Sequence, residues 1–120
     1  MKIDSDLKSK VEAYAENLLK NGDENSAAQV GVLIDTVNYL YSDSSIKDPE
    51  LQGKIVDWVN GLLTETDLDT GEVFNLATVA IEKIEFVDNI PIDDKGLKDK
   101  VVDYVLNIFK NGGADASAVA

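Results

Sequence analysis

The sequence predicts an all-α protein of five helices, arranged as two and a half antiparallel helical hairpins. Three observations support this. Three segments of similar sequence recur at spacings of 44 and 46 residues, each segment places apolar residues at helical spacing, and no stretch shows sustained strand alternation. A repeat of this length is typical of stacked helical hairpins. Both a short α-solenoid and a closed helical bundle fit the pattern.

The repeated segments span residues 4–19, 48–63 and 94–109, and they align without gaps. They share the pattern D-x-x-L-x-x-K-[VI]-x-x-[YW]-[AV]-x-x-[LI]-[LF]. In the first segment the apolar positions Leu7, Val11, Tyr14 and Leu18 follow a 4-3-4 spacing, which keeps them on one face of a helix. Each segment is therefore expected to form one helix with the same side facing the core.

The residues flanking these segments are typical of helix ends. An Asp stands three residues before each leading Leu, where an N-cap belongs, and Asp48-Pro49-Glu50 adds a proline and an acid in the first turn. The first and third helices are expected to stop at Lys20-Asn21-Gly22 and Lys110-Asn111-Gly112.

Two further helices are expected between the repeated ones, at about 26–42 and about 70–87. Asn25 or Ser26 would cap the first, and Asp69 or Thr70 the second. Ile90-Pro91-Ile92 is expected to be an extended linker, because proline disfavours helix at the preceding residue. The helices would form one domain over residues 1–111, and the small residues of 112–120 would form a flexible tail.

The pattern also predicts how the helices pack. The segment 48–63 is apolar over a wide arc, which suits a central helix. The first helix carries Glu12 and Glu16 where the second carries Val56 and Asn60, as an N-terminal capping helix would. The third is rich in apolar residues, yet no helix follows it. Either the five helices close around it, or its apolar side contacts another chain; the residues of that side are Val102, Leu106 and Phe109.

The composition excludes most catalytic chemistry. The chain of 120 residues has no His and no Cys, and all 11 of its cations are lysines. Thiolate nucleophiles, the Ser-His-Asp triad, two-histidine metal sites and arginine fingers are therefore ruled out. We expect no enzyme, no cofactor and no metal site. A cytoplasmic location is expected, because the sequence shows no signal peptide and no apolar run of about 20 residues that could span a membrane.

Three motifs each have a functional and a structural interpretation. Residues 66–72 resemble a calcium loop, but Leu68 stands where a ligand is needed, so an acidic turn is expected. Aligned aromatics suggest either a binding ladder or one repeated core position, which we favour; they are Tyr14, Trp58 and Tyr104. Three lysines are also aligned: Lys10, Lys54 and Lys100. They suggest either an anion site or ion pairs, because Asp57 follows Lys54 by three residues and Asp103 follows Lys100 by three. We favour the ion pairs.

The acidic residues carry the functional hypothesis. The formal net charge is −12, which disfavours direct binding to nucleic acid or anionic membranes and permits a partner with a basic surface. Many carboxylates fall in the expected turns between helices, which could line one edge; the candidate edge comprises Asp23, Glu24, Glu65, Asp67, Asp69, Glu72, Asp93 and Asp94.

We therefore expect a non-catalytic protein-interaction module, an adaptor or inhibitor whose acidic edge binds a basic partner. In its strongest form the edge would mimic a nucleic acid, as some immunity-type proteins do. One alternative is a structural subunit, such as one of a homo-oligomer, held through the apolar side of the C-terminal helix. The other is a protein that binds Mg²⁺ or Ca²⁺ through carboxylates alone.

Overall fold

The computed structural model describes residues 5–20, 22, 24–91 and 94–112, and these form five α-helices and no strand. The helices are α1 (Ser5–Leu19), α2 (Glu24–Ser42), α3 (Pro49–Glu65), α4 (Thr70–Asp88) and α5 (Lys95–Gly112). The predicted all-α fold is confirmed. Because the three repeated segments correspond to α1, α3 and α5, the expected alternation of repeated and intervening helices is also confirmed.

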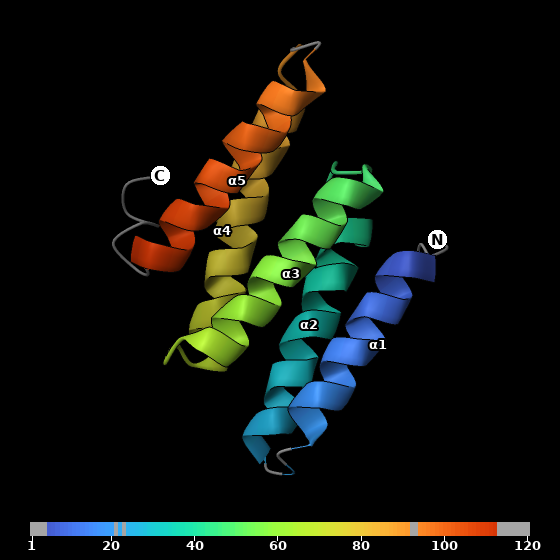
Figure 1. The fold of residues 1–120 in the computed structure, drawn as a ribbon, viewed down its shortest axis with the longest axis vertical. Coiled ribbons are helices and arrows are strands. Elements are labelled where there is room, and N and C mark those ends of the chain that lie inside the picture. Colours follow the sequence, from blue (N-terminus) through green and yellow to red (C-terminus); the bar gives the residue numbers. More distant parts are fainter. Residues whose placement is uncertain (1–4, 21, 23, 92–93, 113–120) are drawn as a thin grey trace.

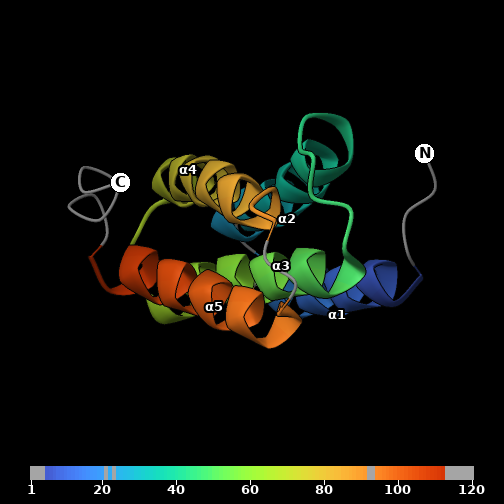
Figure 2. The same ribbon diagram turned by 90° about the horizontal axis from the view of Figure 1, so that it is seen from above.

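The helices lie in two layers (Figures 1 and 2). One layer holds α1, α3 and α5 side by side, and we call it the repeat layer; the other holds α2 and α4. Helix α3 contacts all four other helices, whereas α1 and α5 make no contact with each other within their described residues. The predicted central role of α3 is thus confirmed, and the arrangement is a short open stack rather than a ring closed around the last helix.

Aspartate side chains cap the N-termini of α3 and α4, as Asp94 does for α5. The Asp48 carboxylate accepts a hydrogen bond from the Glu50 N–H at 2.9 Å, with Pro49 in the first turn. The Asp69 carboxylate accepts one from the Glu72 N–H at 2.8 Å. Such caps satisfy amide donors that have no partner inside the helix. Both caps follow the sequence prediction.

Other predicted boundaries need correction. Helix α2 begins at Glu24, so Asn25 and Ser26 lie inside it and do not cap it. Helix α5 includes all three residues of the predicted stop, Lys110-Asn111-Gly112, and its described part ends at Gly112. By contrast, α1 ends as predicted: Gly22 has a φ of 67°, a left-handed conformation that glycine adopts without steric cost. Asp4, the expected first cap, and residues 113–120 of the expected tail lie outside the described residues.

The apolar core runs through all five helices. Its fully buried side chains include Leu33, Ile55, Leu62, Ile81 and Ile84. The side of α5 that was expected to bind another chain is also in this core: Val102, Leu106 and Phe109 are 1%, 6% and 3% exposed. Of the two alternatives for this side, coverage by helices of the same chain is the one observed, because α3 and α4 pack against α5; contact with another chain through Val102, Leu106 and Phe109 is not supported.

Candidate interaction surfaces

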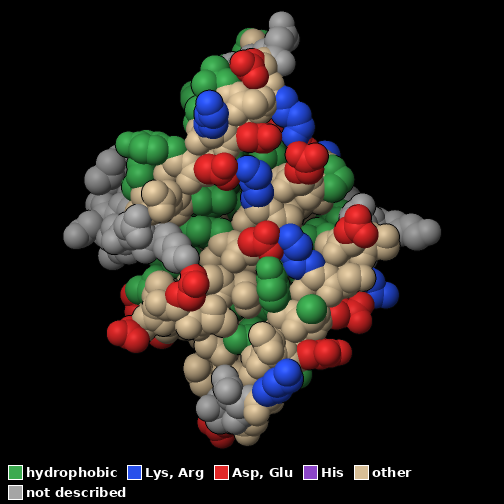
Figure 3. Space-filling view, viewed as in Figure 1, with side chains coloured by type: hydrophobic (Ala, Val, Ile, Leu, Met, Phe, Trp, Pro, Cys, Tyr) green, Lys and Arg blue, Asp and Glu red, His purple; other side chains and the backbone are tan. Residues whose placement is uncertain are grey.

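A row of lysine–carboxylate pairs crosses the repeat layer. The Lys10 Nζ of α1 lies 2.9 Å from the Asp57 carboxylate of α3, and the Lys54 Nζ of α3 lies 2.8 Å from the Asp103 carboxylate of α5. Figure 3 shows lysine and acidic side chains next to one another on this face. The sequence predicted ion pairs for these lysines, but each pair joins one repeat to the next rather than two positions of one helix.

The aligned aromatic residues make contacts in the same direction. The Tyr14 hydroxyl of α1 donates a hydrogen bond to Asp57, and the Trp58 indole N–H of α3 donates one to the Leu106 carbonyl of α5 at 2.8 Å. Burial, followed by the hydrogen bond to Asp57 and the charge of that carboxylate, raises the pKa of Tyr14 to about 12. At these two positions the aromatic residue is therefore part of the contact between successive repeats.

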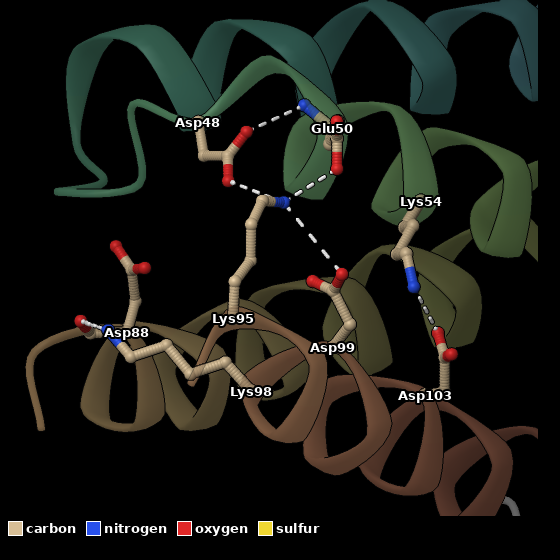
Figure 4. Close-up of polar contacts among 8 residues, drawn as sticks. All are labelled: Asp48, Glu50, Lys54, Asp88, Lys95, Lys98, Asp99 and Asp103. Carbon is tan, nitrogen blue, oxygen red and sulfur yellow. Dashed lines mark hydrogen bonds and ion pairs between the residues drawn. The ribbon is translucent and has the colours of Figure 1, made fainter. Parts of the chain in front are cut away.

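Lys95, in the first turn of α5, binds three carboxylates (Figure 4). Its Nζ lies 2.6 Å from Glu50, and 3.7 Å from both Asp48 and Asp99. The hydrogen bond to Glu50, together with the charges of Asp48 and Asp99, raises the pKa of Lys95. Nearby, Lys98 donates to the Asp88 carbonyl at 2.8 Å. These contacts fasten the beginning of α5 to α3 and to the end of α4.

Five residues of the predicted acidic edge gather at one end of the molecule, which we call the acidic end. The Gln29 side chain of α2 donates to the Leu63 carbonyl of α3 at 3.1 Å, so the α1–α2 and α3–α4 turns lie near each other. Figure 1 shows both turns at the same end of the helices. All five carboxylate side chains are exposed there; they belong to Glu24, Glu65, Asp67, Asp69 and Glu72.

The predicted edge is not one continuous surface. Asp94 precedes α5 at the opposite end, where it caps the helix by accepting a hydrogen bond from the Leu97 N–H at 3.2 Å. Asp23 and Asp93 lie outside the described residues. The split follows from the topology, because successive turns of a helical hairpin stack alternate between its two ends. Only turns separated by one full repeat lie at the same end.

The outer face of α5 is exposed and partly apolar. Leu97 is 48% exposed, Tyr104 67% and Ile108 36%. Lys100 lies on the same face, and no described residue forms an ion pair or hydrogen bond with the Lys100 or Tyr104 side chain. We call these four residues the terminal face. It is one edge of the repeat layer, since among the described helices α5 contacts only α3 and α4.

The sequence reasoning assigned the partner-binding role to the other side of α5. A signal for the terminal face was present, because Leu97, Lys100 and Tyr104 align with Leu7, Lys10 and Tyr14 of the first repeat. However, α5 is apolar on two sides. Only the tertiary structure shows which of the two is covered by α3 and α4.

The described residues form shallow grooves on the repeat layer, and they contain no cluster of metal ligands. A shallow groove between α1 and α3 is lined by the ion-paired Lys10, Lys54 and Asp57 among others. Within the part of the chain that the structure describes, no group of three or more carboxylates is placed to hold a metal ion. The α3–α4 turn that resembles a calcium loop instead serves helix α4, whose cap is Asp69.

None of the helices, over their described residues, is both long and apolar enough to cross a membrane. Comparison of the chain with protein-family models, with curated proteins and with solved structures gives no match.

Proposed function

We propose that this protein is a non-catalytic interaction module that binds a basic protein through its acidic end. The observation that carries the proposal is the way charge is distributed along the repeat layer. The first halves of α1, α3 and α5 carry six lysines: Lys8, Lys10, Lys54, Lys95, Lys98 and Lys100. Three of these form ion pairs with carboxylates of the layer, whereas the acidic end presents five exposed carboxylates.

The acidic end suits fast association with a cationic surface. The α3–α4 turn, which carries Asp67 and Asp69, is held by the Asp69 cap and by the hydrogen bond from the Leu68 N–H to the Thr66 hydroxyl. The backbone that carries these two carboxylates is therefore fixed before a partner arrives. Charge complementarity of this kind mainly raises the association rate and makes binding sensitive to salt. The net charge of −12 extends the same attraction beyond contact distance.

Two variants with the same net charge test whether binding depends on the acidic end or only on the net charge of the chain. The first neutralises four carboxylates of the acidic end, with Glu24→Gln, Glu65→Gln, Asp67→Asn and Glu72→Gln. The second neutralises four exposed carboxylates elsewhere, with Glu12→Gln, Glu16→Gln, Asp35→Asn and Glu82→Gln. Asp69 is left unchanged in both because it caps α4. Circular dichroism would establish that both variants fold like the original chain.

Each protein is immobilised and exposed to a cell lysate at low salt, and the retained proteins are quantified. We expect the original chain and the second variant to retain the same basic proteins, and the first variant to retain at least fivefold less of them. Equal retention by the two variants would contradict the proposal. Competition by duplex DNA for the retained proteins would further indicate that the acidic end mimics a nucleic acid.

A further inference from the structure

The terminal face of α5 repeats a contact surface that the molecule uses twice inside its own fold. In α1 and α3 the aligned lysine reaches the next repeat helix and binds a carboxylate, Asp57 or Asp103. The aligned aromatic residue, Tyr14 or Trp58, donates a hydrogen bond to that same helix. Lys100 and Tyr104 hold the same positions in α5, and the part of the chain that the structure describes contains no further repeat helix.

Apolar residues of the terminal face are exposed, whereas the aligned residues of the first two repeats are buried. Leu7 and Leu51 are each 3% exposed, whereas the aligned Leu97 is 48% exposed. Trp58 is 8% exposed, whereas the aligned Tyr104 is 67% exposed. Residues that are covered in the first two repeats are thus exposed in the third. Exposed Tyr side chains beside aliphatic ones are typical of residues that contribute strongly to protein–protein binding.

We propose that the terminal face binds an amphipathic helix of another protein that carries a central Asp or Glu. The carboxylate of this helix accepts hydrogen bonds from the Lys100 ammonium and the Tyr104 hydroxyl, as Asp57 does from Lys10 and Tyr14. Apolar residues one turn before and after the carboxylate cover Leu97 and Ile108. The incoming helix therefore takes the place of a fourth helix in the repeat layer.

A second copy of this chain does not fit the same chemistry. Its own Asp57 and Asp103 are already bound to Lys10 and Lys54. The first helix has Ala13 at the aligned position, so it offers no carboxylate in that register. Two copies would also repel each other, since each carries a net charge of −12.

A helical peptide tests the inference directly. The probe has the sequence of residues 94–110 with Asp99→Leu and Asn107→Leu, which places an apolar residue one turn before and one turn after Asp103. A lactam bridge on its far side holds it helical. It is titrated into the isotope-labelled full chain, and amide shifts are followed by NMR. We expect the largest shifts at Leu97, Lys100, Tyr104 and Ile108. A matched peptide carrying Asp103→Asn should bind roughly three- to tenfold more weakly.

Variants of the full chain test whether the peptide binds at the terminal face. Lys100→Gln and Tyr104→Phe should each weaken binding of the peptide. Lys8 is an exposed lysine of α1, and Lys8→Gln should leave peptide binding unchanged. Equal binding of the Asp and Asn peptides, or shifts centred on Lys10 and Tyr14 of α1 instead of Lys100 and Tyr104, would overturn the inference. So would a dimeric mass in sedimentation that Tyr104→Lys abolishes, because the occupant would then be a second copy. These readouts do not involve the carboxylates of the acidic end, so the function proposed above succeeds or fails separately.

Discussion

At the scale of single residues, Asp57 joins α3 to α1 through two side-chain hydrogen bonds. It accepts hydrogen bonds from both Lys10 and Tyr14, whereas the aligned Asp103 accepts one from Lys54. Trp58, which aligns with Tyr14, donates to a backbone carbonyl instead. One pattern position therefore makes different contacts in successive repeats, because Tyr and Trp place their donors at different distances from the helix.

We expect Asp57→Asn to destabilise the chain by about 1–2 kcal/mol, and Asp103→Asn by about 0.5–1 kcal/mol, because partly exposed charged hydrogen bonds contribute modestly to stability. Urea denaturation followed by circular dichroism measures both values. If Asp103→Asn costs as much as Asp57→Asn, the Tyr14 hydrogen bond contributes nothing measurable.

The raised pKa of Tyr14 predicts how stability changes at high pH. Because its pKa is about 12 in the folded chain and about 10 when unfolded, the folded state holds this proton more tightly. The associated stability is fully present below pH 10 and is lost as the pH rises toward 12. Tyrosinate absorbance should show Tyr14 ionising late, and Tyr14→Phe should remove that late step. Tyr39→Phe should remove a separate part of the late ionisation, since burial and nearby acids also raise the pKa of Tyr39.

At the scale of the helices, capping residues set where α3 and α4 begin. Asp69→Ala removes the acceptor for the Glu72 N–H and should cost about 1 kcal/mol of stability, whereas Asp69→Ser should retain most of it. Thermal unfolding measures the difference. Asp67→Ala, in the same turn, should change stability by less than about 0.5 kcal/mol, and an equal loss from both alanine variants would assign the effect to turn charge instead of capping.

Most of the helices could be predicted from the sequence because their signals are local. Apolar spacing and the Asp-Pro-Glu sequence indicated the start of α3 to within one residue. Asp69 correctly indicated the start of α4. The start of α2 was placed two residues late, because Asn25 and Ser26 are good capping residues that the fold includes within the helix. Helix α5 includes Asn111 and Gly112, which were expected to end it, since Asn and Gly favour a helix end without imposing one.

At the scale of the whole molecule, excess negative charge opposes compaction. We expect the melting temperature to rise by about 3–6 °C when sodium chloride is raised to about 0.5 M, because screening reduces self-repulsion more than it weakens the few ion pairs. Calorimetry measures the shift. The variant neutralised at Glu12, Glu16, Asp35 and Glu82 should shift less, and a fall in melting temperature would show that the ion pairs dominate.

The sequence by itself determined the number, order and type of the elements, the central position of α3 and the absence of His, Cys and Arg chemistry. These depend on composition and on periodicities that a single helix contains. Only the tertiary structure decided that the acidic turns divide between two ends, that Lys10 and Lys54 pair with the next repeat, and that Leu97 and Tyr104 rather than Val102 and Leu106 are exposed. The reason is physical: spacing along a helix shows which residues share a face, but which face is covered depends on the packing of other helices.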